Sequence, residues 1–419
     1  MKNFLRAGHF PTLMAALLYF DVSFMTWVLL GPLAPFLRED MGLTATQQGL
    51  VTAIPLLGGS LFRPLLGMLG DRIGGRRTGM IGMTLTLITL AVGWQFATTP
   101  IHLYALGLML GIAGASFAVA LPLASRWYPP QYQGLAMGIA GAGNSGTLLA
   151  TLFAPRLAER YGWASTLGLA IVPLVAVFIL FVLMARDSPK RPAPATLRDY
   201  GALLREPDTL SMAFLYSLTF GGFVGLASFL PTYFHEQYHI SRVAAGDVTT
   251  VVVVSGSLLR PIGGWLSDRF GGYRLLVTLL TGFAVCLGFV AAGVTLRPAV
   301  ALFFVGLGML GMGNGAVFQL VPQRFPERIG LVTGIVGAAG GLGGFFLPSV
   351  LGAVRDYYGS YAPGLVLFTT AFVAGTFVLL ELGNRWSRRW SETAVRQAGV
   401  YSYRATLRAG VGRVPMDPA

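Results

Sequence analysis

The chain has 419 residues, of which 54% are hydrophobic and only 11% are charged. A soluble domain carries about 25% charged residues, so this composition excludes a soluble protein and indicates a polytopic membrane protein. The net charge is +13, and its placement in the loops accounts for it without nucleic acid as a partner. The single cysteine, Cys286, excludes a disulfide within the chain. No cluster of metal ligands is visible, and we expect neither metal nor cofactor.

Twelve segments are long and apolar enough to cross the ~30 Å hydrocarbon core as helices. They are residues 12–36, 45–69, 78–97, 101–123, 134–157, 163–185, 209–234, 244–267, 275–296, 299–321, 329–352 and 361–384. The sequence therefore predicts an all-α integral membrane protein with twelve transmembrane helices. Residues 186–208 are charged and rich in proline, which predicts a cytoplasmic linker between two six-helix bundles at 1–185 and 209–384. Residues 385–419 are expected to form a loosely ordered, basic cytoplasmic tail.

The basic residues of the loops predict the orientation. If the N-terminus is cytoplasmic, 22 Lys and Arg lie inside and six lie outside. The positive-inside rule then predicts that both termini lie in the cytoplasm. We expect the protein to lie in the inner membrane of the cell. The two basic residues that remain, Arg63 and Arg260, lie within predicted spans.

The two halves of the chain repeat each other. Residues 56–77 read LLGGSLFRPLLGMLGDRIGGRR and residues 253–274 read VVSGSLLRPIGGWLSDRFGGYR. Two six-helix halves related in this way are an architecture of secondary transporters, with the substrate site between the halves. The repeated cytoplasmic loop is a candidate gating motif. Its residues are Gly67, Asp71, Arg72, Arg76, Arg77, Asp268 and Arg269.

Arg63 and Arg260 are the candidate substrate-binding residues with the clearest physical reason. Asp71 lies at the cytoplasmic end of the predicted helix, and Arg63 precedes it by eight residues. At 1.5 Å per residue this spacing is about 12 Å, so Arg63 lies near the middle of the membrane. Burying an arginine there costs at least about 2.5–3.5 kcal/mol. One acid, Asp21, lies deep in a span and cannot neutralise both arginines, so the charge count favours a substrate anion over a static ion pair. A guanidinium matches flat oxyanions with two parallel hydrogen bonds.

Two amides also lie at membrane depth. Asn144 belongs to the glycine-rich segment 138–155, and Asn314 belongs to GMGNGAVFQLVP at 311–322. The glycines provide smooth faces for close helix packing, but packing does not explain a buried amide, which needs a hydrogen-bond partner. We therefore include both asparagines among the candidate substrate-binding residues.

The chain resembles the major facilitator superfamily, whose signature loop matches DRIGG and DRFGG. Within it, GAGNSGTLLATLFAP, GIVGAAGGLGGFFLP, FDVSFMTWVLLGPLAPF and GIAGASF resemble the nitrate/nitrite porter family. The resemblance implies that Arg63 and Arg260 clamp the anion from opposite halves and that Asn144 donates a hydrogen bond to it. It also implies that three aromatic residues contact the flat anion. They are Phe117, Tyr216 and Phe220.

The expected function is secondary active transport of nitrate, with nitrite as a second substrate, by nitrate/proton symport. The expected mechanism is alternating access of a monomer in the lipid bilayer. Asp21 is the candidate proton-coupling residue, because an anion that neutralises the arginines makes protonation of Asp21 easier. The alternative for Asp21 is that it only orients an arginine. The alternatives for the chain are a nitrate/nitrite antiporter, a carrier of another small anion, and a non-transporting anion sensor. No GxxxxGK[ST] motif indicates ATP use, and no nucleophile–base pair indicates an enzyme.

Overall fold

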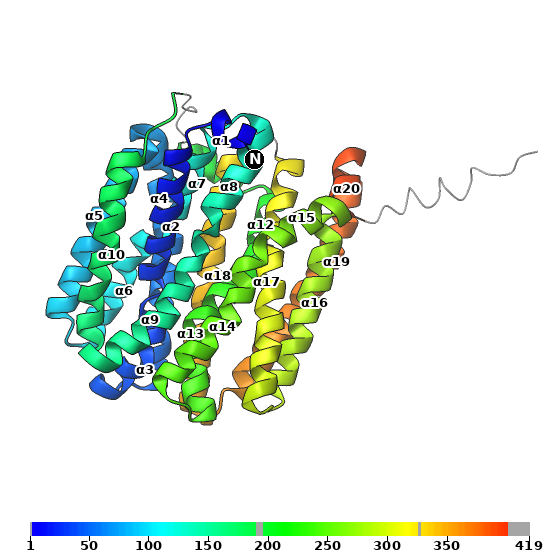
Figure 1. The fold of residues 1–419 in the computed structure, drawn as a ribbon. Coiled ribbons are helices and arrows are strands. Elements are labelled where there is room, and N and C mark those ends of the chain that lie inside the picture. The colour runs from blue at the N-terminus through cyan, green and yellow to red at the C-terminus, as the bar shows by residue number, and fades with distance from the viewer. Residues whose placement is uncertain (1, 190–195, 326–327, 401–419) are drawn as a thin grey trace, which may run out of the picture.

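The computed structural model of the protein describes residues 2–189, 196–325 and 328–400. These residues form helices joined by short loops, with no strand among them (Figure 1). The first helices are α1 (Lys2–Ala7), α2 (Phe10–Trp27), α3 (Leu30–Met41), α4 (Ala45–Ile73), α5 (Gly75–Phe96), α6 (Pro100–Gly114), α7 (Phe117–Ser125), α8 (Pro130–Gly141), the 3₁₀ segment η1 (Ala142–Ser145), α9 (Gly146–Tyr161) and α10 (Trp163–Met184).

The later helices begin in the region predicted as a linker. They are α11 (Leu197–Leu203), α12 (Pro207–Tyr216), the π-helical segment η2 (Ser217–Gly221), α13 (Gly222–Tyr238), α14 (Arg242–Leu258), α15 (Arg260–Phe270), α16 (Gly272–Ala291), α17 (Leu296–Arg324), α18 (Ile329–Tyr358), α19 (Ala362–Arg389) and α20 (Glu392–Ala398). Helices α2–α10, called the first group here, lie beside helices α12–α19, the second group (Figure 1).

Eleven segments of the described residues are long and apolar enough to cross a membrane. The predicted fifth span is not among them, although α8, η1 and α9 follow one another without a break. Its many glycines, with Asn144 and Ser145, make this segment less apolar than the other spans. The all-α membrane fold predicted from the sequence is confirmed, and α8–η1–α9 completes the set of twelve spans.

Several helix pairs join the groups. Among them, α4 packs along α18, α9 packs along α14, and α3 packs along α13. A Cβ atom at Gly246 of α14 would lie 2.7 Å from the carbonyl oxygen of Thr151 on α9, so only glycine allows this approach. Helices α1 and α20 lie at one face of the molecule, called the terminal face, and the end of α3 lies at the opposite, distal face (Figure 1).

Five of the twelve spans are interrupted near their middle. The interruptions fall between α2 and α3, between α6 and α7, at η1, at η2, and between α14 and α15. Irregular backbone is tolerated at membrane depth where protein or water, rather than lipid, surrounds it. The interruptions therefore mark the interior that the helices enclose.

The repeated loop after the second and eighth spans has a backbone reason for its glycines. Gly74 and Gly271 follow α4 and α15 with φ angles of 97° and 88°, a region that side chains other than glycine rarely adopt. The repetition in the sequence thus corresponds to the same helix-ending turn, built twice.

The tail was expected to be loosely ordered from residue 385, and this is wrong for its first part. Helix α19 continues to Arg389, and α20 follows it. The buried carboxylate of Asp208 accepts hydrogen bonds of 3.1 Å from the indole nitrogens of both Trp386 and Trp390, and Arg324 pairs with it at 2.5 Å. These contacts fix the end of α19 to the start of α12. The rest of the predicted tail, 401–419, and residues 190–195 of the linker lie outside the described residues.

We predict that Gly111→Ala destabilises the protein. A Cβ atom at Gly111 of α6 would overlap the backbone of Gly58 on α4, so the two helices would have to separate. Gly138→Ala is the matched control, because a Cβ at Gly138 has nothing within 4 Å. Thermal unfolding in detergent should show a lower midpoint for Gly111→Ala and no loss for Gly138→Ala. An unchanged midpoint for Gly111→Ala would contradict the close packing.

Candidate functional site

Arg63 lies on α4 with 2% of its surface exposed. Its Nε donates a 3.2 Å hydrogen bond to the carbonyl oxygen of Gly114, the last residue of α6. Its Nη1 donates to the carbonyl oxygen of Gly337 on α18, in the second group. The carbonyl end of a helix carries partial negative charge, so α6 stabilises the buried cation. Arg63 thus contacts both groups of helices.

Arg260 is the first residue of α15, at the interruption that follows α14. Its Nη2 lies 3.5 Å from the hydroxyl oxygen of Tyr216, which is a long hydrogen bond. Its Nη1 is buried and has no hydrogen-bond partner. Arg260 is therefore held more loosely than Arg63 and keeps a donor free.

No carboxylate among the described residues forms an ion pair with Arg63 or Arg260. Asp21, the one acid predicted deep in a span, accepts a 2.6 Å hydrogen bond from the hydroxyl of Ser145 in η1. Asp21 is thus bound to the first group's own helix break. The alternative in which Asp21 orients an arginine has no contact to support it.

Aromatic rings surround the two arginines. The guanidinium carbons of Arg63 and Arg260 lie 5.6 and 5.9 Å from the centre of the same ring, Phe117. Arg63 also lies 5.3 Å from the Phe220 ring, on which Tyr216 stacks with centroids 5.1 Å apart. The structure therefore brings together all three predicted aromatic residues and both arginines. Rings facing a cation stabilise it without neutralising its charge.

Two further aromatic residues belong to this shell and were not predicted. The Trp27 ring lies 5.2 Å from the Arg63 guanidinium, and the Phe318 ring lies 5.7 Å from that of Arg260. Phe318 follows Asn314 by four residues, so helical spacing puts both side chains on the same face of α17. Trp27 stands at the end of α2 and gave no comparable signal.

The two predicted amides are buried, each 1% exposed. The side-chain oxygen of Asn144 has no hydrogen-bond partner, and neither side-chain polar atom of Asn314 has one. Asn144 lies in η1, and its neighbour Gly143 packs against Phe20. The ring centres of Phe20 and Phe117 lie 5.6 Å apart. Buried amides with unused hydrogen-bonding capacity need water or a ligand. Asn144 therefore lies in a segment that packs against the aromatic shell, Asn314 lies one helical turn before Phe318, and both have free polar atoms.

The helix interruptions explain how these side chains meet. Trp27 ends α2, Phe117 begins α7, Phe220 lies in η2 and Arg260 begins α15. Short π-helical insertions often occur at functional sites. Four side chains of the site therefore lie at these interruptions rather than within an unbroken helix.

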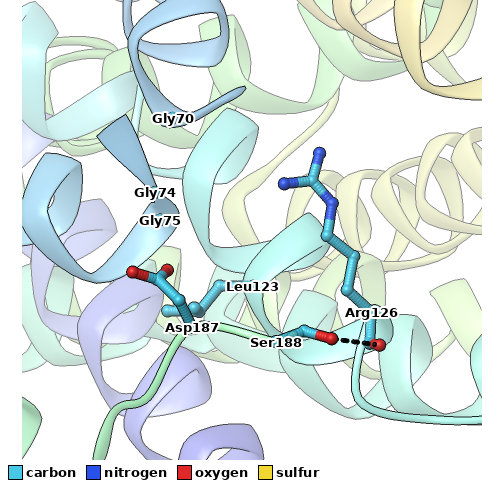
Figure 2. Close-up of a pocket in the computed structure, with 7 residues that line it drawn as sticks. All are labelled: Gly70, Gly74, Gly75, Leu123, Arg126, Asp187 and Ser188. Carbon is cyan, nitrogen blue, oxygen red and sulfur yellow. Dashed lines mark hydrogen bonds between the residues drawn. The ribbon is translucent and has the colours of Figure 1, made fainter. Parts of the chain in front are cut away.

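The candidate gating motif lies elsewhere, at the ends of α4 and α15 on the terminal face. Arg126 pairs with Asp71 at 2.6 Å within the first group. The backbone N–H of Arg76 donates a 3.0 Å bond to Asp187, which lines a small cavity behind the Gly74 turn (Figure 2). Arg269 lies over the rings of its own segment. Gly67, Arg72, Arg77 and Asp268 occur in the same two segments.

The arrangement can bind a small anion. Two guanidinium groups face one ring, no carboxylate among the described residues pairs with them, and unpartnered donors remain on Arg260 and Asn314. A monovalent anion between the arginines would compensate one of the two positive charges. No group of three or more metal-ligating side chains occurs among the described residues.

Comparison with known proteins gives consistent results. The family model described as Major Facilitator Superfamily matches residues 15–348. A probable nitrate/nitrite transporter, NarK2, of Mycobacterium tuberculosis is 40% identical over 86% of this chain and 93% of its own. A nitrite extrusion protein of Bacillus subtilis is 35% identical over 85% of this chain and 90% of its own. The crystal structure of a bacterial homologue of the lysosomal transporter Spinster covers 91% of this chain and 98% of its own, with a TM-score of 0.69 and 19% identity, and so shows a shared fold.

We predict opposite effects on stability from removing each arginine. Arg260→Met should raise the unfolding midpoint in buffer without small anions, because it removes an uncompensated charge that costs at least about 2.5 kcal/mol to bury. Arg63→Met should lower the midpoint, because Arg63 donates to Gly114 and Gly337. Thermal unfolding in detergent measures both. A lower midpoint for Arg260→Met would mean that its charge is already neutralised.

Proposed function

The chain belongs to the major facilitator superfamily and, within it, to the nitrate/nitrite porter family, and from this premise we propose that it carries nitrate, and nitrite as a second substrate, together with protons. Membership makes the chain a multi-pass membrane transport protein and not an enzyme. The nature of the anion, the proton coupling and the orientation are our proposals.

The observation that carries the substrate proposal is the pair of arginines on one aromatic ring. Arg63 comes from the first group and Arg260 from the second, and both lie within 6 Å of the centre of Phe117. An anion between them makes charge-assisted hydrogen bonds to both groups at once. Because one chain supplies both arginines, we propose that the monomer in the bilayer is the functional unit.

The surroundings of the arginines suit a flat anion. Tyr216 and Phe220 stack with an angle of 6° between their planes, and Trp27 stacks on Phe220 at 13°. Nearly parallel ring faces admit a planar ion such as nitrate more easily than a tetrahedral one. The side-chain nitrogen of Asn314 has no hydrogen-bond partner and can donate to the anion, and we propose that the side-chain nitrogen of Asn144 is a second donor. Nitrite, which is also flat, fits the same arrangement.

The contacts between the groups support alternating access. Among the described residues, three ion pairs join the two groups, and all lie at the distal face: Arg38–Glu236, Arg156–Asp247 and Arg242–Glu39. Just on the terminal side of the helix interruptions, a Cβ atom at Gly141 of α8 or Gly264 of α15 would have nothing within 4 Å. The excess of basic residues assigns the terminal face to the cytoplasm. We therefore propose that this arrangement is inward-facing and that the groups, with the predicted boundaries, rock as two units.

We propose that Asp21 couples a proton to the anion, and its contacts support this role. Its partner Ser145 follows Asn144 directly, and a Cβ atom at Gly143 of the same 3₁₀ segment would lie 2.8 Å from the Asp21 backbone nitrogen. An anion that binds Asn144 and neutralises the arginines changes both the electrostatic potential and the hydrogen bonding at Asp21. Anion and proton then favour each other's binding, as symport requires.

The test is nitrate uptake into proteoliposomes with an imposed inward proton gradient, with the vesicles either empty or loaded with nitrite. We expect accumulation in empty vesicles, driven by the gradient. Uptake only into nitrite-loaded vesicles would replace symport by nitrate/nitrite exchange. Uptake of neither anion under any condition would contradict the proposed substrate.

In the same assay, Asp21→Asn should retain exchange of nitrate across the membrane and lose gradient-driven accumulation, because asparagine keeps an acceptor for Ser145 but cannot ionise. Ser145→Ala is the control variant, since it removes the hydrogen bond and leaves the carboxylate in place. It should keep the coupling with an altered pH dependence. Full accumulation by Asp21→Asn would exclude Asp21 as the coupling residue.

A further inference from the structure

Helices α4 and α18 meet at the boundary between the two groups, and their backbones come close together at the distal end. A Cβ atom at Gly49 of α4 would lie 2.4 Å from the carbonyl oxygen of Pro348 on α18, and a Cβ atom at Gly352 would lie 2.3 Å from the carbonyl oxygen of Ala45. These distances are shorter than a van der Waals contact, so only glycine allows them. The two backbones are therefore in direct contact at this end.

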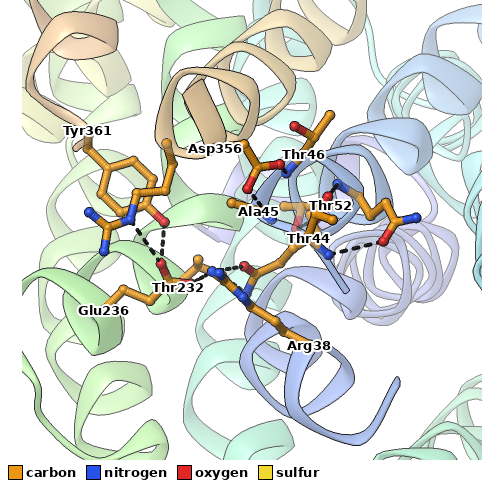
Figure 3. A network of polar contacts seen from close by, with 12 residues as sticks. Arg38, Thr44, Ala45, Thr46, Thr52, Thr232, Glu236, Asp356 and Tyr361 are labelled. Atoms are coloured by element: carbon orange, nitrogen blue, oxygen red, sulfur yellow. Dashed lines mark hydrogen bonds and ion pairs between the residues drawn. The ribbon is translucent and has the colours of Figure 1, made fainter. Parts of the chain in front are cut away.

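A carboxylate joins the same two helix ends. Asp356, at the end of α18, accepts hydrogen bonds of 2.9 and 2.7 Å from the backbone nitrogens of Ala45 and Thr46, at the start of α4 (Figure 3). A carboxylate at a helix N-terminus is favoured by the helix dipole. Asp356 thus caps a helix of the first group from the second group.

An ion pair beside Asp356 also joins the groups at the distal face. Glu236, near the end of α13, pairs with Arg38 of α3, in the first group. The hydroxyl of Tyr361 donates a 2.8 Å hydrogen bond to the same carboxylate, and the Nε of Arg355 lies 3.7 Å from it (Figure 3). The distal end of the boundary is therefore closed by polar contacts as well as by glycines.

Side chains of α4 reach α18 at the depth of the arginines. The hydroxyl of Ser60 donates a hydrogen bond to the carbonyl oxygen of Ala338, and Arg63 donates to the carbonyl oxygen of Gly337. Residue numbers rise along α4 where they fall along α18, so the two helices are antiparallel. Their pairing extends from the distal end to the middle of the molecule.

One turn nearer the terminal face, a side chain from a third helix lies between α4 and α18. Gly67 follows Arg63 by four residues and Gly334 precedes Gly337 by three, so both glycines continue the paired faces. A Cβ atom at Gly67 would lie 3.7 Å from the hydroxyl oxygen of Tyr200, and a Cβ atom at Gly334 would lie 3.6 Å from the same oxygen. One atom of Tyr200 thus lies against both helices.

The two helices have separated at this level. Among the described residues, no atom of α18 lies within 4 Å of a Cβ position at Gly67, and no atom of α4 lies within 4 Å of one at Gly334. Nearer still to the terminal face, a Cβ atom at Gly330 of α18 would have nothing within 4 Å. Helices α4 and α18 are therefore in contact at the distal end and apart at the terminal end, with the Tyr200 hydroxyl in the gap.

Tyr200 belongs to α11, in the segment between the two groups. Of the α11 residues whose exposure the structure describes, only Tyr200 and Leu203, three positions apart, are not exposed. Helix α11 packs against α18. Burial raises the pKa of the Tyr200 hydroxyl, and the negative charge of Asp71, near the end of α4, raises it further. The hydroxyl is therefore uncharged and lies close to the repeated loop.

The proposed alternating access requires this gap to close. When the distal face opens, the terminal ends of α4 and α18 approach each other, and Gly67 and Gly334 allow the backbone contact that Gly49 and Gly352 make at the other end. The Tyr200 hydroxyl occupies the space that closure removes. The terminal ends cannot meet until Tyr200 leaves.

We propose that Tyr200 is a spacer residue, which stabilises the inward-facing arrangement by filling the gap between Gly67 and Gly334 and has to leave before the outward-facing arrangement forms. This rests on the proposed function, since it takes the terminal face as the inner one and the movement as a rocking of two groups. The spacer binds no anion and carries no proton. Through this one side chain, the segment between the groups sets the ratio of the two populations.

The experiment is a distance measurement between spin labels at the terminal ends of the two groups, in nanodiscs without nitrate. Cys286→Ser removes the native thiol. Arg186→Cys, after α10, and Arg389→Cys, at the end of α19, accept the labels, because both residues are exposed. We expect the longer distance to dominate in the otherwise unmodified protein. In Tyr200→Ala the shorter distance should gain population by about twofold or more, because the gap can close.

Leu204→Ala is the matched control. It removes an apolar side chain that is about half exposed, four residues after Tyr200, and should keep the unmodified distribution. An unchanged distribution in Tyr200→Ala would overturn the proposal. An equal shift in Leu204→Ala would do the same, because it would assign the effect to the whole segment rather than to Tyr200.

A second variant keeps the test valid if Tyr200→Ala does not fold. Tyr200→Phe keeps the ring and removes only the hydroxyl that lies between the two glycines, so the shorter distance should gain population, but less than in Tyr200→Ala. An unchanged distribution in Tyr200→Phe would contradict the proposal. The distance measurement needs no nitrate, so a failed substrate proposal and a failed spacer give different results.

Discussion

Two positive charges without a carboxylate partner, held in the middle of a membrane protein, are the constraint on which the rest of the structure depends. The cost of burying the charge of Arg63 is offset because the carbonyl end of α6 and a carbonyl of α18 accept its hydrogen bonds. Aromatic rings that face the guanidinium add to this stabilisation. Arg260 has less support, with one long hydrogen bond and one free donor. This difference suits a site in which one arginine is fixed and the other closes on the anion. It also makes the site without an anion less stable than a neutral one, and in our proposal the binding of an anion offsets that cost.

The glycines and the interrupted helices bring the two arginines and the aromatic rings together. Close contacts such as those between α9 and α14 bring the groups near enough for one anion to touch both. The interruptions aim Phe117, Phe220 and Arg260 at the centre. In the proposed alternating access, the groups form contacts at one face and lose them at the other, so binding and movement would use the same interfaces. At the distal face, polar contacts of Glu236 and Asp356 join the two groups.

The sequence predicted much of the fold, because hydropathy, loop charge and the internal repeat are local signals. It also predicted Arg63 and Arg260, since a charge in an apolar run is visible without coordinates. Trp27 and Phe318 were missed because aromatic residues are common in membrane helices and only packing shows which of them meet the arginines. Residues 385–400 of the predicted tail are ordered because they contact Asp208, which lies almost 180 residues earlier in the chain. The partners of Glu236 likewise come from three separate segments. The functional roles of the site residues stay predictions.

The most direct test of the account is the nitrate affinity of the purified protein, measured by calorimetry, for Arg63→Lys, Arg260→Lys and the double variant. Lysine keeps the charge and removes the fork that binds an oxyanion with two hydrogen bonds. If both arginines hold one anion, the losses in binding free energy should be non-additive by about 0.5–3 kcal/mol, with one anion bound per chain. Additive losses, or two anions per chain, would mean that the arginines bind separately and would contradict the account.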